Sequence, residues 1–433
     1  MKRKTWYRGA SASLMVTFIL GVGVGAGLCY AGLELMREDA QQAPSVSISG
    51  QEGITAPIPE AVPMAAEFVK TPEAIEEIKA SVEVIPVETT PSLSVQIDPD
   101  TVWPIRHLII GFEGTALSND VQNLICQYLP GGIWIRERNV IDYIQLTELI
   151  LEIRGVYAKT GLDKIDPLIF FAPESRLDHN PLQLSTALSY KEIAEQGDFD
   201  AIKKVGFDTA NAAIKAGIDV LLAPPLNVYD AEETDSAMEE LFFGNSAEVV
   251  AHAGLAYAEG LMEGGAIAVA KDYPGSGTAI PQRDGILLLA ETDVNSLVSV
   301  MMPFAEAAAH DIHGLLVGAI AVPALDVSVP GRPAFVSPIL VDEALRNQWG
   351  YEGVIISDDI LLAEGWSLTT VEKDILAALS AGCDAVMISA TTSEDLEHIV
   401  KTVIHGIDRG TLREGTLELA RQKMDLWRQQ VDR

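Results

Sequence analysis

The sequence has little cysteine, few aromatic residues and few basic residues. Its three cysteines, Cys29, Cys126 and Cys383, lie far apart and match neither a disulfide framework nor a Cys/His metal spacing. Lysine and arginine number 30 against 62 aspartate and glutamate residues, which gives a net charge of −32. A surface this acidic repels phosphate backbones, so nucleic acid is not expected as a partner.

Four basic residues, Lys2, Arg3, Lys4 and Arg8, precede an uncharged stretch from Gly9 to Leu33. This stretch is longer than the roughly 20 apolar residues that a membrane-spanning helix needs. We therefore interpret residues 1–36 as a membrane anchor. Its basic flank stays in the cytoplasm and leaves the rest of the chain periplasmic or extracellular. A signal segment that is cleaved to give a secreted protein is the alternative.

Residues 37–102 are poor in aromatics and rich in Pro, Glu, Ser, Val and Ala, which predicts a disordered acidic linker. Residues 103–433 then remain for a folded domain. This length suits one α/β barrel, which often exceeds about 250 residues.

Short apolar runs alternate with amphipathic stretches along this domain, which is typical of parallel strands buried on both faces. The runs are His107–Gly111, Gly132–Ile135, Pro167–Ala172, Asp219–Ala223, Ile267–Ala270, Leu315–Ala319, Gly353–Ile356 and Asp384–Ile388. The stretches with helical spacing are Asn119–Leu129, Asp142–Arg154, Asp198–Ala216, Ser246–Met262, Asp293–His310, Ser337–Trp349, Thr370–Ala381 and Ser393–Ile407. This pattern predicts a (β/α)8 barrel of the TIM type, preceded by a transmembrane helix and a flexible linker. An open doubly wound sheet is the second interpretation, but no glycine-rich dinucleotide motif follows the first run.

Residues that directly follow the runs should line the active site of such a barrel, because its loops leave the strands at that end. Carboxylates are abundant there and histidine is absent. No repeated ligand spacing indicates a metal site, and no cofactor is expected. The residues are Glu113, Glu137–Asn139, Glu174–Arg176, Asn227, Lys271, Asp272, Asp326, Ser357–Asp359 and Ser389.

Four segments in order resemble family 3 glycoside hydrolases, especially bacterial β-N-acetylhexosaminidases. Trp349–Ile360 is similar to the family's strand-end motif Gly-Phe-x-Gly-Val-x-x-Ser-Asp-Asp-Leu. Ala270–Gly277 resembles Ala-Lys-His-Phe-Pro-Gly-His-Gly, Val322–Asp326 resembles Tyr-Pro-Ala-Leu-Asp, and Leu222–Val228 resembles Ala-Pro-Val-Val-Asp-Val. The resemblance covers nearly the whole predicted barrel.

The resemblance implies that Asp358 is the nucleophile of a retaining glycosidase and that Lys271 binds a sugar hydroxyl. A retaining enzyme places its nucleophile about 5 Å from a second carboxyl group that donates the proton. Without the resemblance, Asp358 also fits a carboxylate that caps the following helix, and Lys271 fits a salt-bridged surface lysine.

The sequence departs from the family at several positions. Asp272 replaces a histidine that follows the lysine, and Gln282 and Asp284 fall where the family's loop carries its Asp/His acid/base pair. Asp284 is the tentative acid/base here. Glu174 and Arg176 remain as candidate substrate-binding residues, together with Lys271 and Asp272.

Two functions follow from these residues. The first is an exported glycoside hydrolase that cleaves a β-linked O-glycosidic bond, with N-acetylhexosamine of cell-wall glycan as a candidate substrate. The alternative is a catalytically degenerate barrel that binds glycan or a cell-envelope partner without turnover. In both cases the partners are a carbohydrate and, through the N-terminal helix, the membrane.

Overall fold

The computed structural model describes residues 103–161, 166–173, 188–229, 239–277, 279–281, 286–289, 294–360, 368–389 and 393–431. All of these residues belong to one compact unit of the chain. The predicted anchor and linker, residues 1–36 and 37–102, lie outside the described residues. Among the helices that are described, none is both long and apolar enough to cross a membrane.

Eight parallel strands form a closed barrel within the described part of the chain, in the same order as in the sequence. Each strand pairs in parallel with its neighbours, and β1 pairs with the last strand, β11, to close the ring. The predicted barrel is therefore confirmed. Its strands are β1 (Leu108–Gly111), β2 (Gly132–Ile135), β3 (Leu168–Phe171), β4 (Val220–Leu221), β5 (Ile267–Tyr273), β8 (Gly314–Val317), β10 (Val354–Asp359) and β11 (Ala385–Ser389).

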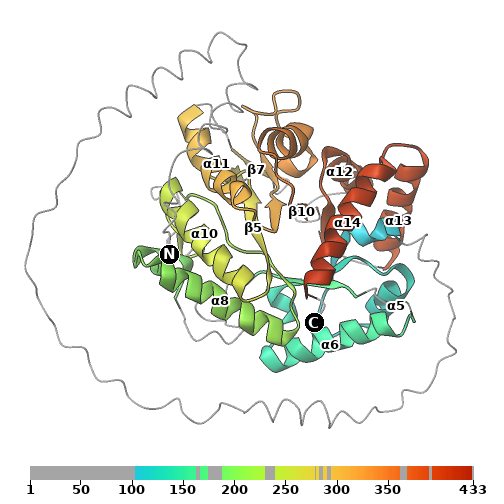
Figure 1. Cartoon of the computed structure of the whole chain (residues 1–433). Coiled ribbons are helices and arrows are strands. Elements are labelled where there is room, and N and C mark those ends of the chain that lie inside the picture. Colours follow the sequence, from blue (N-terminus) through green and yellow to red (C-terminus); the bar gives the residue numbers. More distant parts are fainter. Residues whose placement is uncertain are drawn as a thin grey trace, which may run out of the picture. The chain divides into compact units, whose positions relative to one another are not determined.

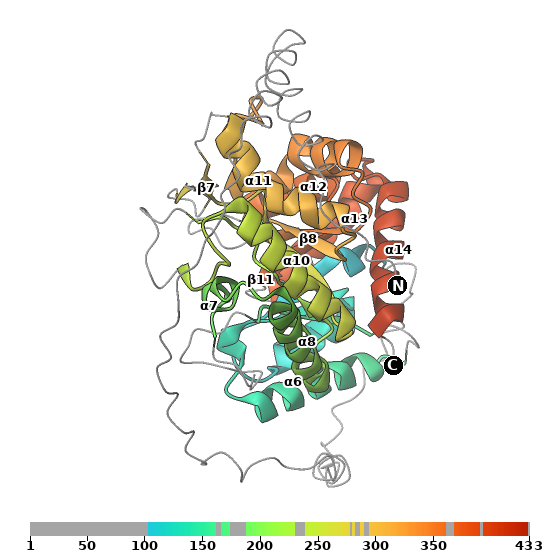
Figure 2. The same cartoon turned by 60° about the vertical axis from the view of Figure 1, so that its left-hand side comes forward.

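Helices follow the strands and pack around the outside of the barrel, as Figures 1 and 2 show for α6, α8, α10 and α11. The helices are α5 (Asn119–Tyr128), α6 (Tyr143–Ala158), α7 (Tyr190–Glu195), α8 (Phe199–Ala216), α10 (Ala247–Glu263), α11 (Val294–Ala309), α12 (Leu368–Ala381), α13 (Ser393–Asp408) and α14 (Glu414–Val431). The predicted helix Ser337–Trp349 is a π-helix, η4 (Ile339–Gln348). Its last turn has the hydrogen bond typical of a π-helix, because the Trp349 N–H donates to the Ala344 carbonyl, five residues earlier, over 2.9 Å.

Shorter elements complete the description. They are the 3-10 helices η1 (Trp103–His107), η2 (Glu137–Asn139) and η3 (Ala334–Val336), and the strands β6 (Ile280–Pro281), β7 (Leu287–Leu288) and β9 (Ile320–Ala321). The three strands form a small separate sheet in the order β6-β7-β9.

Alternate residues of each strand face the barrel interior and the helix layer, because side chains of a strand point to opposite faces. Apolar side chains from seven of the eight strands fill the interior. Strand β2 contributes Trp134, which is partly buried and packs against them. The interior residues from the strands and their ends are Ile109, Leu168, Phe170, Val220, Leu222, Ile267, Val269, Leu316, Val354, Ile356, Ala385 and Met387. The barrel is therefore a packed core and not a pore.

Helix α14 closes the end of the barrel at which the strands begin. Its Met424 and Trp427 belong to the same apolar cluster as the interior residues of the strands. The Trp427 ring lies against Gly314, the first residue of β8, where a Cβ atom would come within 2.8 Å of the indole. This role of α14 in closing the barrel was not predicted from the sequence.

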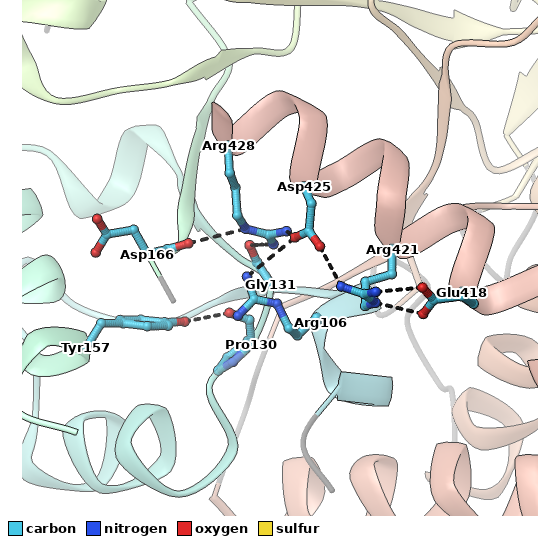
Figure 3. A network of polar contacts seen from close by, with 9 residues as sticks. All are labelled: Arg106, Pro130, Gly131, Tyr157, Asp166, Glu418, Arg421, Asp425 and Arg428. Carbon is cyan, nitrogen blue, oxygen red and sulfur yellow. Dashed lines mark hydrogen bonds and ion pairs between the residues drawn. The ribbon is translucent and has the colours of Figure 1, made fainter. Parts of the chain in front are cut away.

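Polar contacts hold α14 in this position (Figure 3). Arg428 donates to the carbonyl oxygen of Gly131 over 2.8 Å and to that of Asp166 over 3.3 Å, and pairs with Asp425 over 2.7 Å. Asp425 also lies 4.0 Å from the buried Arg106 at the start of the barrel. An active site is therefore expected at the opposite end of the barrel, where the loops that follow the strands begin.

Candidate active site

Two of the predicted site residues face the open end of the barrel, which we call the mouth. Asp358 lies near the end of β10, beyond the inward-pointing Val354 and Ile356, and Lys271 lies near the end of β5, beyond Ile267 and Val269. The charges of Lys271 and Asp272 both act on the Asp358 carboxylate, so the three side chains lie close together. Only β8 separates β5 from β10 in the barrel, so these side chains belong to one site.

Both residues lie at irregularities of their strands. Between β10 and β11, Ser357 pairs with Val386 and Asp359 pairs with Met387, so Asp358 is an extra residue without a partner. Between β5 and β8 the register shifts in the segment that contains Lys271 and Asp272. Such bulges occur next to active sites, where they redirect a side chain away from the regular ladder.

Asp358 is a half-buried carboxylate in a negatively charged environment. Its Oδ1 accepts a hydrogen bond from the backbone N–H of Asp359 over 2.8 Å. Burial and the nearby charge of Asp272 raise the pKa of Asp358 to about 7, and this rise is opposed by the Asp359 N–H and the positive charge of Lys271. Asp358 is therefore a group whose protonation changes near neutral pH.

The neighbouring Asp359 has a structural role. It is buried, and its Oδ1 accepts the backbone N–H of Ser389 over 2.8 Å while its other oxygen accepts the Ser389 hydroxyl. These bonds tie the end of β10 to the end of β11.

Lys271 and Asp272 are held by the segment that follows β4. The Lys271 N–H donates to the Pro224 carbonyl over 3.0 Å, and the Lys271 carbonyl accepts the Leu226 N–H over 2.6 Å. The buried Asn227 donates from Nδ2 to Oδ2 of Asp272 over 2.9 Å. Its Oδ1 accepts the Ser276 N–H, also over 2.9 Å, so Asn227 fixes both Asp272 and the loop behind it.

Asp326, another carboxylate at this end of the barrel, is engaged within its own loop. It accepts hydrogen bonds from Arg332, Ser328 and Ser337 and is almost completely buried. Burial alone would raise the pKa of Asp326, but the bonds from Ser337, Ser328 and Arg332 lower it below its ordinary value. This residue therefore organises the segment after β8.

Trp134 and Arg136 were missed by sequence reasoning, although they face the mouth from β2. The Arg136 guanidinium lies 5.4 Å from the Trp134 ring centroid, and its Nη2 donates to the Phe112 carbonyl over 2.9 Å. The sequence-based prediction placed only Glu137–Asn139 at the end of the second strand and left out Trp134 and Arg136. Strand alternation from Gly132 would have identified both, since Trp134 and Arg136 share its orientation.

Three further predicted residues, Glu174, Arg176 and Asp284, lie outside the described residues. Their placement as substrate-binding and acid/base groups remains a prediction.

Residues 94–424 match the model of the family described as "Glycosyl hydrolase family 3 N terminal domain". The chain belongs to this family. The resemblance inferred from the four sequence segments is confirmed, and a glycoside hydrolase enzyme is supported.

Curated relatives agree with this assignment. A protein of Methylococcus capsulatus named "Beta-hexosaminidase" is 25% identical over 333 residues, which cover 74% of this chain and 96% of the relative. A protein of Stenotrophomonas maltophilia with the same name is 28% identical over 291 residues, covering 65% of this chain and 82% of the relative.

Solved structures share the fold. A family 3 β-N-acetylglucosaminidase from Paenibacillus sp. superposes with a TM-score of 0.68 at 20% identity. The match covers 78% of this chain and 64% of that structure, so the chain spans less than two thirds of it. A β-N-acetylhexosaminidase from Beutenbergia cavernae gives a TM-score of 0.64 at 20% identity, covering 77% of this chain and 99% of that one.

Proposed function

We propose that this chain is an exported glycoside hydrolase that cleaves a β-linked O-glycosidic bond by a retaining mechanism. N-acetylhexosamine units of cell-wall glycan are the proposed substrate class, and the part of this that the curated relatives support by name is a β-linked hexosamine. Export rests on residues 1–36, whose uncharged stretch behind a basic flank is typical of an anchor or signal segment. The observation that carries the proposal is the meeting of Asp358, Lys271 and Asp272 at the barrel mouth.

Asp358 acts as the nucleophile. Its ionised carboxylate attacks the anomeric carbon, the bond to the leaving sugar breaks, and a glycosyl-enzyme forms that water then hydrolyses. The rigid end of β10 and the Asp359 N–H hold the attacking carboxylate in place. Lys271 stabilises the ionised form of Asp358, because it lowers the pKa that burial and Asp272 raise.

Substrate hydroxyl groups bind to Lys271 and Asp272, with Asn227 keeping Asp272 oriented. Glu174 and Arg176, which follow β3 in the sequence, provide further sugar contacts. Asp284 supplies the proton to the leaving group and later removes one from water. A carboxylic acid can do this at neutral pH when a desolvated site raises its pKa.

The test is hydrolysis of fluorogenic β-N-acetylglucosaminide and β-glucoside substrates by the wild type, Asp358→Asn and Asp284→Asn. Asp358→Asn should abolish turnover, and Asp284→Asn should lower the rate by roughly 10²–10⁴. A mechanism-based fluorosugar should form a covalent adduct, located at Asp358 by mass spectrometry of the digested protein. Turnover that survives in Asp358→Asn would refute the assignment of the nucleophile.

The second candidate function is a barrel that binds glycan or a cell-envelope partner without turnover. It is motivated by Asp272 and Asp284, which replace histidines of the family motif. Sugar binding in calorimetry, equal in the wild type and Asp358→Asn and accompanied by no hydrolysis of any substrate in the panel, would favour this function.

A further inference from the structure

A cluster of cationic side chains lies at the mouth beside the ends of β1 and β2. It consists of Arg136 and Arg138 with Glu113, and we call it the arginine cluster. In the ring of strands, β11 and β1 separate β2 from β10, and β3 and β4 separate β2 from β5. Arg136 therefore faces the same mouth as Asp358 and Lys271, from a third side. An eight-stranded barrel is narrow enough for one bound molecule to reach all three sides.

The charges of the arginine cluster are not balanced by its own carboxylate. Oε1 of Glu113 lies 3.0 Å from Nη2 of Arg136 and 2.6 Å from Nη2 of Arg138, so one carboxylate oxygen serves two guanidinium groups. Among the described residues, no second carboxylate forms an ion pair with either arginine. In a chain with a net charge of −32, this local excess of positive charge favours an anionic ligand group.

Two hydrogen-bond donors next to the cluster also lack acceptors. Nε1 of Trp134 and Nε of Arg136 are both buried, and neither has a hydrogen-bond partner in the part of the chain that the structure describes. Buried donors are nearly always paired in folded proteins, because an unpaired one costs roughly 1–3 kcal/mol. The polar groups around Arg136 are therefore not fully satisfied by the described part of the chain.

The arrangement is held in place before any ligand binds. A Cβ atom at Gly111 would lie 3.4 Å from the Trp134 ring and 3.6 Å from Cζ of Arg136, so both side chains pack over this glycine. The Phe112 carbonyl accepts Nη2 of Arg136 over 2.9 Å. The Arg136 side chain is 12% exposed and that of Arg138 is 52% exposed, so the cluster is accessible mainly through Arg138. Such preorganisation reduces the entropic cost of binding.

We propose that Arg136 and Arg138, supported by Trp134, form a subsite for a carboxylate group on the sugar bound at the mouth. The substrate class is then an acidic glycoside, preferred over its neutral counterpart. A guanidinium group binds a carboxylate through two parallel hydrogen bonds, which a neutral hydroxyl cannot reproduce. This inference rests on the proposed glycosidase function and narrows its substrate.

The test compares kcat/KM for two pairs of p-nitrophenyl β-glycosides. One pair is the N-acetylglucosaminide and its 3-O-carboxymethyl ether, and the other is the glucoside and the glucuronide. The wild type should prefer the acidic member of at least one pair. Arg136→Gln should lower kcat/KM for that member by about 10–100-fold, mainly through KM, and change the neutral member less than about threefold. Arg136→Lys should lose most of the same preference, because it keeps the charge but not the two parallel bonds.

Arg154→Gln is the matched control. Arg154 is also a partly exposed arginine in an ion pair, with Asp219 over 2.8 Å before β4, far from the mouth. Its loss should leave the acidic-to-neutral ratio unchanged. The proposal is overturned if the wild type has the higher kcat/KM for the neutral members. It is also overturned if Arg136→Gln lowers kcat/KM equally for the acidic and the neutral member, which is the result expected for a purely structural role of Arg136.

Binding measurements test the carboxylate subsite independently of the proposed hydrolase activity. Calorimetry on Asp358→Asn with glucuronic acid and with glucose requires no turnover. If no glycoside is hydrolysed but Arg136→Gln still weakens binding of the acid alone, the hydrolase proposal fails and the carboxylate subsite stands. Equal binding of both sugars, before and after the substitution, overturns the subsite.

Discussion

Replacement of Asp358 by asparagine should stabilise the protein above neutral pH. The pKa of Asp358 rises from 3.8 to about 7 on folding, because of burial and the charge of Asp272. At about 1.36 kcal/mol per pH unit, this rise corresponds to an upper limit of roughly 4 kcal/mol. Because the side chain is only half-buried and asparagine must also be solvated, we expect about 1–3 kcal/mol of the limit to be recovered.

The sign and the pH range follow from proton linkage. Between pH 3.8 and about 7, the folded protein keeps the proton on Asp358 while the unfolded chain has lost it. Stability of the wild type therefore falls as the pH rises through this range, and the full penalty is present above pH 7. The stabilisation by Asp358→Asn should be small near pH 4, grow up to about pH 7 and then remain constant.

Thermal unfolding at pH 5, 6, 7 and 8 measures this difference. At pH 8 the variant should unfold on the order of 2–4 °C above the wild type. Asp408→Asn is the control, because it removes an exposed carboxylate at the end of α13 and should give the same small difference at every pH. A lower unfolding temperature for Asp358→Asn at pH 8 would mean that the carboxylate is favourably paired, and would refute the reasoning.

Three other predictions concern the site and its support. First, kcat/KM should rise as Asp358 ionises with a midpoint near pH 7, and Asp272→Asn should move the midpoint to lower pH because it removes a neighbouring negative charge; a pH–rate profile whose midpoint does not move would contradict this coupling. Second, Asp359→Asn should destabilise the protein by about 1–3 kcal/mol in thermal unfolding, because it weakens the hydrogen bonds to Ser389. The same substitution at Asp358 should instead stabilise the protein. Third, Trp427→Ala should cost about 3–5 kcal/mol by opening a cavity in the barrel interior, while the folded fraction keeps its KM; a large change in KM would show that the plug and the mouth are coupled.

The sequence alone determined the architecture, because the strand signal is local. Runs such as Pro167–Ala172 and Asp384–Ile388 are apolar on both faces, and each is followed by helical spacing. A parallel sheet covered by helices on both faces buries many runs of this kind, and the lack of a glycine-rich dinucleotide motif after the first run favoured the closed barrel over an open sheet. The end that carries the site followed from the same pattern, and the resemblance to the family then selected Asp358 and Lys271 among the residues at the strand ends.

The tertiary structure decided which polar residues share a site and which support the fold. Asp358 and Asp359 are adjacent and chemically identical, and only the bulge against β11 separates a carboxylate at the mouth from one that binds Ser389. Likewise, Asp326 follows β8 in the sequence but is bonded within its own loop.

Two features depend on long-range contacts, the barrel plug formed by α14 and the ion pair between Arg136 and Glu113. Trp427 lies more than a hundred residues after Gly314 of β8 in the sequence, and its side chain reaches the interior only because the ring has closed. Arg136 meets Glu113 across the β1–β2 pair, and neither residue type nor spacing reveals that contact. The spacing of apolar residues is a local property that can be read from the sequence. Ion pairing, burial and electrostatic coupling depend on residues that are distant in the sequence and meet only in the folded protein.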